Sequence, residues 1–273
     1  MECKSLGVIG FGQMARAIVE PLLDRGELSA DGLCAVVGSS TRAEQLKRQL
    51  PDAVRIFSAR SDQAGHVWTM PIQLLAIKPQ QLDAVAQSAP SVDQRSTSLL
   101  ISVLAGVSLA RLQRLFPTHR CVRAVPNTPA LVGAGLTALA WGQQVSDQQK
   151  EQVMALFSPV SEVLELPEDK LDAFLALTSS GPAFIALVAE AMADGAVASG
   201  LPRELSLRLA HRTLAGTAAL LDKRELHPAA LKDMVSSPSG TTMAGLRCLE
   251  RNGLRSALIE AVVAAAERSR ELA

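Results

Sequence analysis

Two stretches of small residues could bind anionic groups, and the first lies near the start of the chain. The apolar run LGVI leads into a Gly-x-Gly-x-x-Ala turn, Gly10-Phe11-Gly12-Gln13-Met14-Ala15. Such a turn between a strand and a helix aims free backbone N–H groups and the positive end of a helix dipole at one point, which suits a pyrophosphate. Gly10 would allow the tight turn, Gly12 would let the backbone approach the phosphates, and Ala15 would let the helix pack closely on the strand. The pattern predicts a dinucleotide site, although an ordinary strand–helix junction also contains such glycines.

The residues after the second predicted strand indicate which dinucleotide would bind. A site for NAD usually places Asp or Glu about 20 residues beyond the glycines, where it accepts a hydrogen bond from the ribose 2′-hydroxyl. Here the strand is followed by Ser39-Ser40-Thr41-Arg42, which contains no carboxylate. Hydroxyls and a guanidinium suit a 2′-phosphate, so we predict NADPH, with NADH as the weaker alternative. The other interpretation is that the hydroxyls only cap a helix and Arg42 is solvated.

Three further strand ends carry residues that a ligand could contact. The segment Ala76-Ile77-Lys78-Pro79 stops a strand at a proline, and Lys78 could contact ribose, pyrophosphate or substrate, or could simply close the strand at the surface. The small residues up to Leu104-Ala105-Gly106 are consistent with backbone that passes close to a nicotinamide ring. The stretch 123–129 combines two prolines with polar side chains, which a plain rigid turn would also explain.

The second anion-binding candidate is the loop Ser236-Ser237-Pro238-Ser239-Gly240-Thr241-Thr242, which directly precedes an apolar helix. We expect Gly240 to let the backbone turn sharply. The N–H groups of Gly240, Thr241 and Thr242 would then point out of a helix N-terminus, as in a site for a carboxylate. A structural cap is the alternative, but one Ser or Thr would be enough for that.

Composition excludes several classes of function. The chain has 273 residues with 27 Lys+Arg and 27 Asp+Glu, so no net field recruits nucleic acid or an anionic membrane. No uncharged apolar stretch reaches the roughly 20 residues of a membrane span. The first strand begins too early to leave room for a signal peptide, so we expect a cytoplasmic protein. The absence of tyrosine excludes a Tyr-x-x-x-Lys catalytic pair.

The cysteines and histidines predict no metal site. The four cysteines are far apart and form no Cys-x-x-Cys pair, which indicates neither a zinc site nor a disulfide framework. Cys34 and Cys121 lie in apolar runs and should be core residues. The histidines lack ligand spacing, and His119 and His227 lie beside turn signals, so we expect both at the surface.

The order of the elements predicts an α/β fold with two domains. In the first half, short apolar runs alternate with helical segments, which is typical of a doubly wound parallel sheet of the Rossmann type. From Glu168 onward the apolar residues recur at helical spacing with few strand signals. We predict a dinucleotide-binding domain over residues 1–165 and an all-α domain for substrate binding and dimerisation over residues 166–273. Strands are expected at Leu6–Gly10, Leu33–Val37, Val54–Phe57, Ile72–Ile77, Leu99–Leu104 and Cys121–Val125, with Val132–Trp141 and Val160–Leu166 extending the sheet. Helices are expected at Gln13–Asp24, Thr41–Leu50, Pro79–Ala89, Ser108–Phe116, Asp147–Phe157, Pro182–Ser199, Arg203–Leu221, Pro228–Val235, Thr241–Glu250 and Leu254–Arg268.

The helix predicted at 182–199 is apolar nearly all round, so it should be buried on most sides. A helical domain of this size often completes such burial against a second subunit. We therefore predict a homodimer in which helices are swapped.

Taken in order, five motifs spread over essentially the whole chain resemble those of the pyrroline-5-carboxylate reductase family. The resemblance implies hydride transfer from NAD(P)H to the C=N carbon of Δ1-pyrroline-5-carboxylate, which gives L-proline in the last step of proline biosynthesis. Val125, Ser179 and Phe184 depart from the family pattern but keep a small or apolar character. The motifs are Gly10–Ala15, Ala76–Gln80, Arg123 with Pro126–Pro129, Ser180–Ala183 and Ser237–Thr242.

The resemblance also implies which residues bind each ligand. The Thr242 hydroxyl is our candidate for hydrogen bonding to the ring nitrogen, in a reaction that mainly needs positioning because a protonated imine is already an electrophile. The substrate loop of one subunit would be completed by its dimer partner, and dimers could assemble further, for example into a decamer. The implied substrate-binding residues are Ser237, Gly240, Thr241 and Thr242. The implied cofactor-binding residues are Gly10, Phe11, Gly12, Gln13, Met14, Ser39, Ser40, Arg42, Ala76, Ile77, Lys78, Pro79, Leu104, Ala105 and Gly106.

Two other functions remain to be separated from this one. A β-hydroxyacid or imine dehydrogenase of the same architecture would place a catalytic lysine on the first long helix of the second domain, but residues 181–195 contain none. A nonenzymatic NADP-binding regulator would be expected to have a degraded Ser237–Thr242 loop, and that loop is intact.

Overall fold

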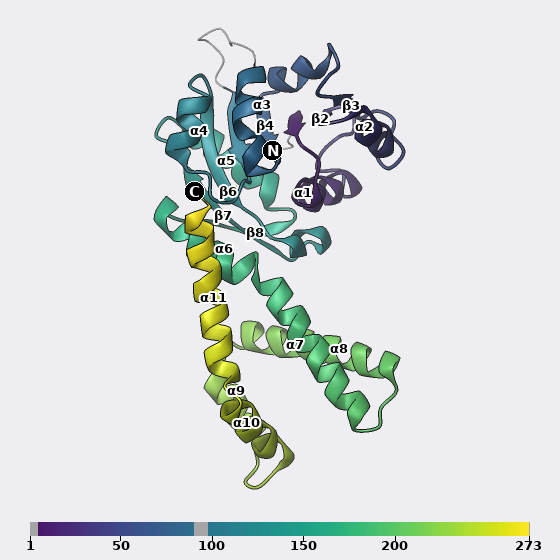
Figure 1. The fold of residues 1–273 in the computed structure, drawn as a ribbon, viewed down its shortest axis with the longest axis vertical. Coiled ribbons are helices and arrows are strands. Elements are labelled where there is room, and N and C mark those ends of the chain that lie inside the picture. Colours follow the sequence, from purple (N-terminus) through teal and green to yellow (C-terminus); the bar gives the residue numbers. More distant parts are fainter. Residues whose placement is uncertain (1–4, 90–97, 273) are drawn as a thin grey trace. The chain divides into compact units, whose positions relative to one another are not determined.

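The first part of the chain folds around an eight-stranded sheet that helices cover on both faces (Figure 1). The computed structural model describes residues 5–89 and 98–272. By its contacts the chain divides into unit 1, Met1–Ser179 with Ala265–Ala273, and unit 2, Ser180–Ala264. The strands are β1 (Leu6–Ile9), β2 (Leu33–Val37), β3 (Arg55–Ser58), β4 (Ile72–Leu75), β5 (Leu99–Ser102), β6 (Arg120–Val125), β7 (Gly135–Trp141) and β8 (Ser161–Glu165).

The sheet has the strand order β3-β2-β1-β4-β5-β6-β7-β8. Neighbouring strands pair in parallel with one exception, since β7 runs antiparallel to β6. A short 3₁₀ segment, η3 (Thr128–Val132), joins those two strands in place of a helical crossover, and so short a connection can only return the chain in the opposite direction. The predicted doubly wound sheet is therefore confirmed, but its last two strands, β7 and β8, run opposite to the first six, which the sequence pattern did not reveal.

Alternation along the strands builds the two cores of unit 1. In β2, Leu33, Ala35 and Val37 belong to one apolar cluster, whereas Cys34 and Val36 belong to the other. Helices α1 (Gln13–Asp24) and α5 (Asp147–Phe157) bury their apolar faces in the first cluster. Helices α3 (Leu82–Ser88) and α4 (Leu109–Leu115) contribute to the second. A strand that is buried on both faces reads as a continuous apolar run, as β2 does.

Local signals explain where the remaining helices of unit 1 begin and end. Helix α2 (Ser40–Lys47) begins after Ser39, whose side chain accepts a hydrogen bond from the Arg42 N–H, and it ends sooner than predicted. The segment predicted as one helix from Pro79 starts as the 3₁₀ turn η2 (Pro79–Gln81) before α3. A further 3₁₀ helix, η1 (Ala64–Thr69), was not predicted. The chain of unit 1 then continues through η4 (Glu168–Lys170) and α6 (Leu171–Thr178).

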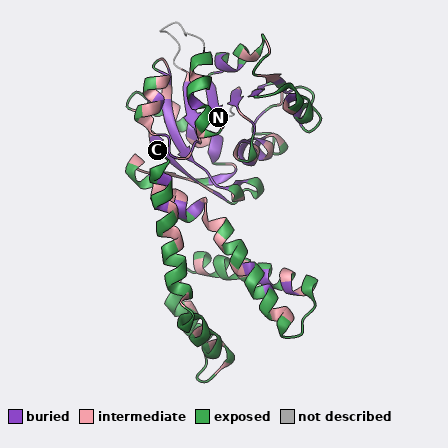
Figure 2. Cartoon of the chain, in the orientation of Figure 1, coloured by how far each residue is buried: buried purple, intermediate pink, exposed green. Residues whose placement is uncertain are grey.

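Unit 2 is helical, as predicted, and most of its residues are exposed (Figure 2). Many large apolar side chains are among the exposed residues. Helix α7 (Gly181–Ala198) packs along α8 (Arg203–Lys223), and the buried residues of α7 are Ala189 and Ala193. Leu187 of the same helix remains 66% exposed. The expectation that this helix is buried on most sides is thus wrong for the single chain. The helices are α7 (Gly181–Ala198), α8 (Arg203–Lys223), α9 (Pro228–Met234), α10 (Thr241–Arg251) and α11 (Leu254–Glu271), the last of which ends in unit 1.

One stretch among the described residues, Glu168–Ala198, is long and apolar enough to cross a membrane as judged by length and composition. It comprises η4, α6 and α7 and is little buried within the chain. Core helices of soluble proteins pass the same test.

Candidate active site

The glycine turn lies against the end of a neighbouring strand. Gly10 has a φ of +85°, and a Cβ there would lie 2.6 Å from the Ala76 carbonyl oxygen, so the turn accepts only glycine. A Cβ on Gly12 would meet nothing within 4 Å, so the backbone of Gly12 faces open space. Ala15 is fully buried where α1 packs on the sheet. The turn therefore presents backbone N–H groups at the start of α1 to any ligand that enters this space.

The other residues of the turn differ in what they can offer. Phe11 is 3% exposed and its side chain belongs to the core, so only its backbone can contact a cofactor. Gln13 is exposed, and Met14 is half-buried against the same core.

Arg42 reaches from α2 to the glycine turn. Its Nη2 donates a hydrogen bond to the Phe11 carbonyl oxygen at 3.3 Å, and its Nη1 donates to Gln45 Oε1 at 3.4 Å. Ser39 caps α2, while Ser40 is exposed in the first turn. Ser39 therefore is a helix cap, and Arg42 is held beside the glycine turn, while its contact with a 2′-phosphate stays a prediction.

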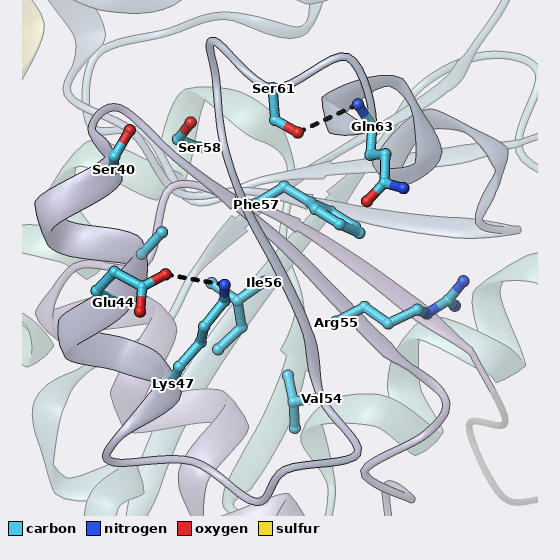
Figure 3. A pocket seen from close by; sticks show the side chains of 11 residues that line it. Ser40, Glu44, Lys47, Val54, Arg55, Ile56, Phe57, Ser58, Ser61 and Gln63 are labelled. Atoms are coloured by element: carbon cyan, nitrogen blue, oxygen red, sulfur yellow. Dashed lines mark hydrogen bonds and ion pairs between the residues drawn. The ribbon is translucent and has the colours of Figure 1, made fainter.

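A pocket of about 440 Å³ adjoins Ser40 between α2 and the edge strand β3 (Figure 3). Ser40, Ser58 and Ser61 lie toward one end, and Lys47 lies toward the other, where it forms an ion pair with Glu44 at 2.9 Å. Ser58 and Ser61 did not emerge from the sequence. Their signal was available, since Ser58 directly follows the predicted strand 54–57 and Ser61 comes three residues later, at the edge where doubly wound sheets bind ligands.

The remaining predicted cofactor residues lie along the same edge. Strands β2, β1, β4 and β5 are parallel neighbours, so their carboxyl ends lie side by side. The N–H of Ala76 donates to the Ile9 carbonyl at 2.8 Å, which sets the Ala76–Pro79 segment beside the glycine turn. Lys78 is exposed, as both of its interpretations require. The Leu104–Gly106 segment follows β5 and turns at Gly106 with a φ of +71°. The Leu104 side chain is in the core, so that residue too can offer only its backbone.

The Ser237–Thr242 loop belongs to unit 2 and has a different internal geometry from the one predicted. The left-handed residue is Ser239, with a φ of +59°, whereas Gly240 is extended with a φ of −76°. A Cβ on Gly240 would crowd Ser237, since it would lie 2.4 Å from the Ser237 Oγ and 3.0 Å from the Ser237 carbonyl oxygen. The Gly240 N–H donates to the Ser237 carbonyl at 3.0 Å and is therefore not free. The N–H groups that open α10 toward a ligand are those of Thr241 and Thr242.

Side chains in this loop are accessible. Ser237 and Thr241 are exposed, and Thr242 is half-buried. The N-cap residue of α10 is Gly240, so no side chain makes a capping hydrogen bond there. The loop is thus open to a ligand and is not closed by its own hydroxyls.

His119 corrects a prediction, because it is 3% exposed and not at the surface. Its ring lies 5.9 Å from that of Trp68 and 5.8 Å from that of Phe116, both edge-on. This burial lowers the pKa of His119 below its ordinary value. His227 is exposed, as predicted, and caps α9.

Neither buried cysteine is a nucleophile. Cys34 and Cys121 are core residues, as predicted. Burial raises the pKa of the Cys34 thiol, and it raises the pKa of the Cys121 thiol to about 12. Cys3 lies outside the described residues. Within the described part of the chain, no group of three or more His, Cys, Asp or Glu side chains could hold a metal ion.

A doubly wound sheet with a glycine turn after its first strand, followed by a helical unit, defines a two-unit protein of the Rossmann dinucleotide-binding class. Residues 5–106 match the family model described as NADP oxidoreductase coenzyme F420-dependent, and residues 168–272 match the model described as pyrroline-5-carboxylate reductase dimerisation. The chain belongs to the pyrroline-5-carboxylate reductase family.

Whole-length relatives support this assignment. The pyrroline-5-carboxylate reductase of Synechocystis sp. is 46% identical over 98% of this chain and 97% of its own length. The Arabidopsis thaliana enzyme is 38% identical over 99% of this chain and 96% of its own length. The crystal structure of Plasmodium falciparum pyrroline carboxylate reductase with NADP bound superposes with a TM-score of 0.87 at 28% identity, covering 100% of this chain and 99% of that one.

Proposed function

We propose that this chain reduces the C=N bond of Δ1-pyrroline-5-carboxylate to L-proline with a reduced nicotinamide dinucleotide. The observation that carries the proposal is the similarity to pyrroline-5-carboxylate reductases over the full length of the chain, which includes both the glycine turn and the Ser237–Thr242 loop. The protein is therefore an oxidoreductase of proline biosynthesis.

The sheet edge of unit 1 suits a dinucleotide. Open space at Gly12 leaves room for the pyrophosphate against the backbone of the turn, with Gln13 and Met14 beside it. Ser39, Ser40 and Arg42 would hold the 2′-phosphate, so NADPH is the preferred cofactor and NADH the weaker one. The segments Ala76–Pro79 and Leu104–Gly106 would line the path toward the nicotinamide. The bound dihydronicotinamide supplies the hydride.

The loop of unit 2 suits a small carboxylate. The N–H groups of Thr241 and Thr242 and the Ser237 hydroxyl would hold the carboxylate of the substrate, within the close turn that Gly240 permits. The Thr242 hydroxyl would bind the ring nitrogen. Because the iminium is already an electrophile, the residues of the chain need only hold the imine carbon about 3–3.5 Å from the hydride donor.

The apolar surface of unit 2 supports a homodimer. Leu187 and Ile185 of α7 are both more than half exposed in the single chain, and residues 168–272 match a dimerisation family. A second copy would cover these side chains, which also accounts for the apolar character of Glu168–Ala198 without a membrane. The partner would complete the substrate loop, and dimers could assemble further, for example into a decamer.

Each of the two predicted domains has its own function in this proposal. We assign cofactor binding to residues 1–165, and substrate binding and dimerisation to residues 166–273. A cytoplasmic location fits the described cysteines, Cys34, Cys121 and Cys248, which are all free.

The test is an assay of NADPH oxidation by the purified chain with pyrroline-5-carboxylate as substrate. Loss of the absorbance of the reduced nicotinamide should accompany formation of proline, identified by mass spectrometry. A β-hydroxyacid offered with NADP⁺ serves as the control for the related dehydrogenases and should give no reaction. NADPH binding without any turnover of pyrroline-5-carboxylate would overturn the proposal and favour a nonenzymatic regulator.

A further inference from the structure

A groove of unit 1 has no part in the proposed function. Its volume is about 630 Å³, and it is lined by residues of α4, by the turn 141–144 that ends β7, and by Glu168. A volume of this size is typical of sites for small organic molecules. None of the individual residues that we assign to cofactor or substrate is among its described lining residues.

One end of the groove lies at the sheet edge opposite the one that suits the dinucleotide. The Gly142 N–H donates to the Cys121 carbonyl at 3.0 Å. Cys121 is the second residue of β6, which runs parallel to β5, so the 141–144 turn lies at the amino ends of these strands. The glycine turn and the Ala76–Pro79 segment follow the carboxyl ends of parallel strands in the same sheet. A ligand at the 141–144 turn would thus be separate from the cofactor.

Arg114 of α4 lines the groove and keeps its charge unpaired. The guanidinium of Arg111, on the same helix, forms an ion pair with Asp83 at 3.1 Å. Arg120, at the start of β6, donates from Nη1 to the Gln144 carbonyl at 2.8 Å. Arg114 is exposed and forms no hydrogen bond or ion pair with the described part of the chain. Its guanidinium is therefore available to a ligand.

The surroundings of Arg114 are held in place without its help. The Gln113 Nε2 donates to the His119 carbonyl at 3.2 Å, which fixes the neighbouring side chain of α4. The Trp141 indole N–H donates to Glu165 Oε2 at 2.6 Å, which fixes the residue at the end of β7. A ligand would therefore meet a groove that is largely preorganised, so that little ordering would oppose its binding.

The polar groups of the groove favour a ligand with one carboxylate. The planar fork of a guanidinium matches the two oxygens of a carboxylate. Arg114 is the only Lys or Arg among the described lining residues, so a second negative charge would have no cation to balance it. Gln143 lines the groove beside it and has no partner in the described part of the chain, so its amide can add a donor. Leu109 and Ala110 offer apolar surface in the same groove.

We propose that this groove is a binding site for a small monocarboxylate with an apolar body, such as an aromatic or branched aliphatic acid. Two N–H groups of Arg114 would donate to the carboxylate oxygens, with the Gln143 amide as a further donor. The apolar body would lie against Leu109 and Ala110. The reduction of the imine uses none of these residues, so the site is additional to the active site.

Benzoate is the probe, and the emission of Trp141 reports on the groove. The chain has two tryptophans, so Trp68→Phe leaves Trp141 as the only one. Benzoate should change this emission saturably at millimolar concentration. Arg114→Gln should raise the Kd for benzoate at least about tenfold, because a charge-assisted pair of hydrogen bonds is lost. Arg48→Gln, which removes another exposed arginine, should leave the Kd unchanged.

Two further ligands test the chemistry of the site. Benzamide, which lacks the charge, should bind at least about tenfold more weakly than benzoate, and inorganic phosphate should not displace benzoate. Calorimetric titration of the chain with both tryptophans repeats each comparison, which covers a failure of Trp68→Phe to fold. Equal affinity of wild type and Arg114→Gln for benzoate would overturn the proposal, since benzoate bound at the Ser237–Thr242 loop would not depend on Arg114. Absence of saturable binding, equal binding of benzamide, or displacement by phosphate would also overturn it.

Discussion

The Arg42 guanidinium is hydrogen-bonded to the Phe11 carbonyl across 31 residues of sequence, with Nη2 3.3 Å from the oxygen. This contact joins the first turn of α2 to the glycine turn. It holds a positive charge at the sheet edge where the ribose end of a dinucleotide would lie. The Arg42 side chain remains half-exposed, so a ligand can still reach its positive charge.

Replacement of Arg42 by alanine should raise KM for NADPH about tenfold, the equivalent of about 1.4 kcal/mol, and should change KM for NADH much less. Steady-state kinetics with both cofactors make the measurement, and Arg48→Ala, at the other end of α2, is the control. Equal increases for the two cofactors would assign Arg42 to support of the glycine turn. An unchanged KM for NADPH would refute the 2′-phosphate role.

The two glycines of the turn should respond differently to alanine. Gly12→Ala places a Cβ in open space, so the free energy of unfolding should stay within about 0.5 kcal/mol while the Kd for NADPH rises at least about tenfold. Gly10→Ala forces a positive φ and a clash with the Ala76 carbonyl, so it should destabilise the fold by more than about 1 kcal/mol. Urea unfolding and NADPH fluorescence titration check the pair. Tight NADPH binding by Gly12→Ala would place the pyrophosphate elsewhere.

Thr242→Ala should lower kcat/KM for pyrroline-5-carboxylate roughly tenfold to a hundredfold, because a hydrogen bond to the ring nitrogen contributes on the order of 1–3 kcal/mol. Thr242→Ser keeps the hydroxyl and should retain most of the activity. Thr69→Ala, in η1 of the other unit, is the control for removal of a threonine. An unaltered kcat/KM in Thr242→Ala would exclude the proposed hydrogen bond.

His119 should make the fold less stable in acid. Burial lowers its pKa in the folded chain below the ordinary 6.5, so the unfolded chain takes up the proton first as pH falls. Stability should therefore decline from about pH 6.5 downward until the folded pKa is reached. Urea unfolding across pH should show a smaller decline for His119→Phe than for the wild type and for the exposed control His211→Gln. Parallel curves for all three would contradict the prediction.

Leu187→Asp should convert the dimer to a monomer, since it places a charge where we propose that a second copy buries an apolar face. Val132→Asp is the matched control, because Val132 is 77% exposed but lies in unit 1. Light scattering over a range of concentrations measures both masses. A wild-type chain that stays monomeric at every concentration would overturn the homodimer.

Local signals predicted the elements of this fold well. Helices α1 and α5 have the predicted bounds because Gly12 and Ser146 begin them and buried positions recur at helical spacing. The run Leu33–Val37 is a strand because it is apolar on both faces. These features depend on a few adjacent residues, so they can be read from the sequence.

Features that depend on distant contacts could not be predicted. The turn signals around His119 did not predict its burial, because the Trp68 ring approaches His119 only after the sheet has formed. The contact between Arg42 and Phe11 likewise requires β1 and β2 to be paired. The sharp turn was expected at Gly240, but the residue with left-handed backbone is Ser239, and a Cβ on Gly240 would crowd Ser237.

The return of α11 to unit 1 has a consequence for synthesis of the chain on the ribosome. The sheet is complete once β8 has emerged, so a nascent chain can already form the edge that suits a dinucleotide. Ser269 of α11 lies 97 residues beyond Asp172 and can reach it only after unit 2 has been synthesised. Cofactor capture can thus precede the synthesis of unit 2, whereas the contact between α11 and Asp172 can form only after it.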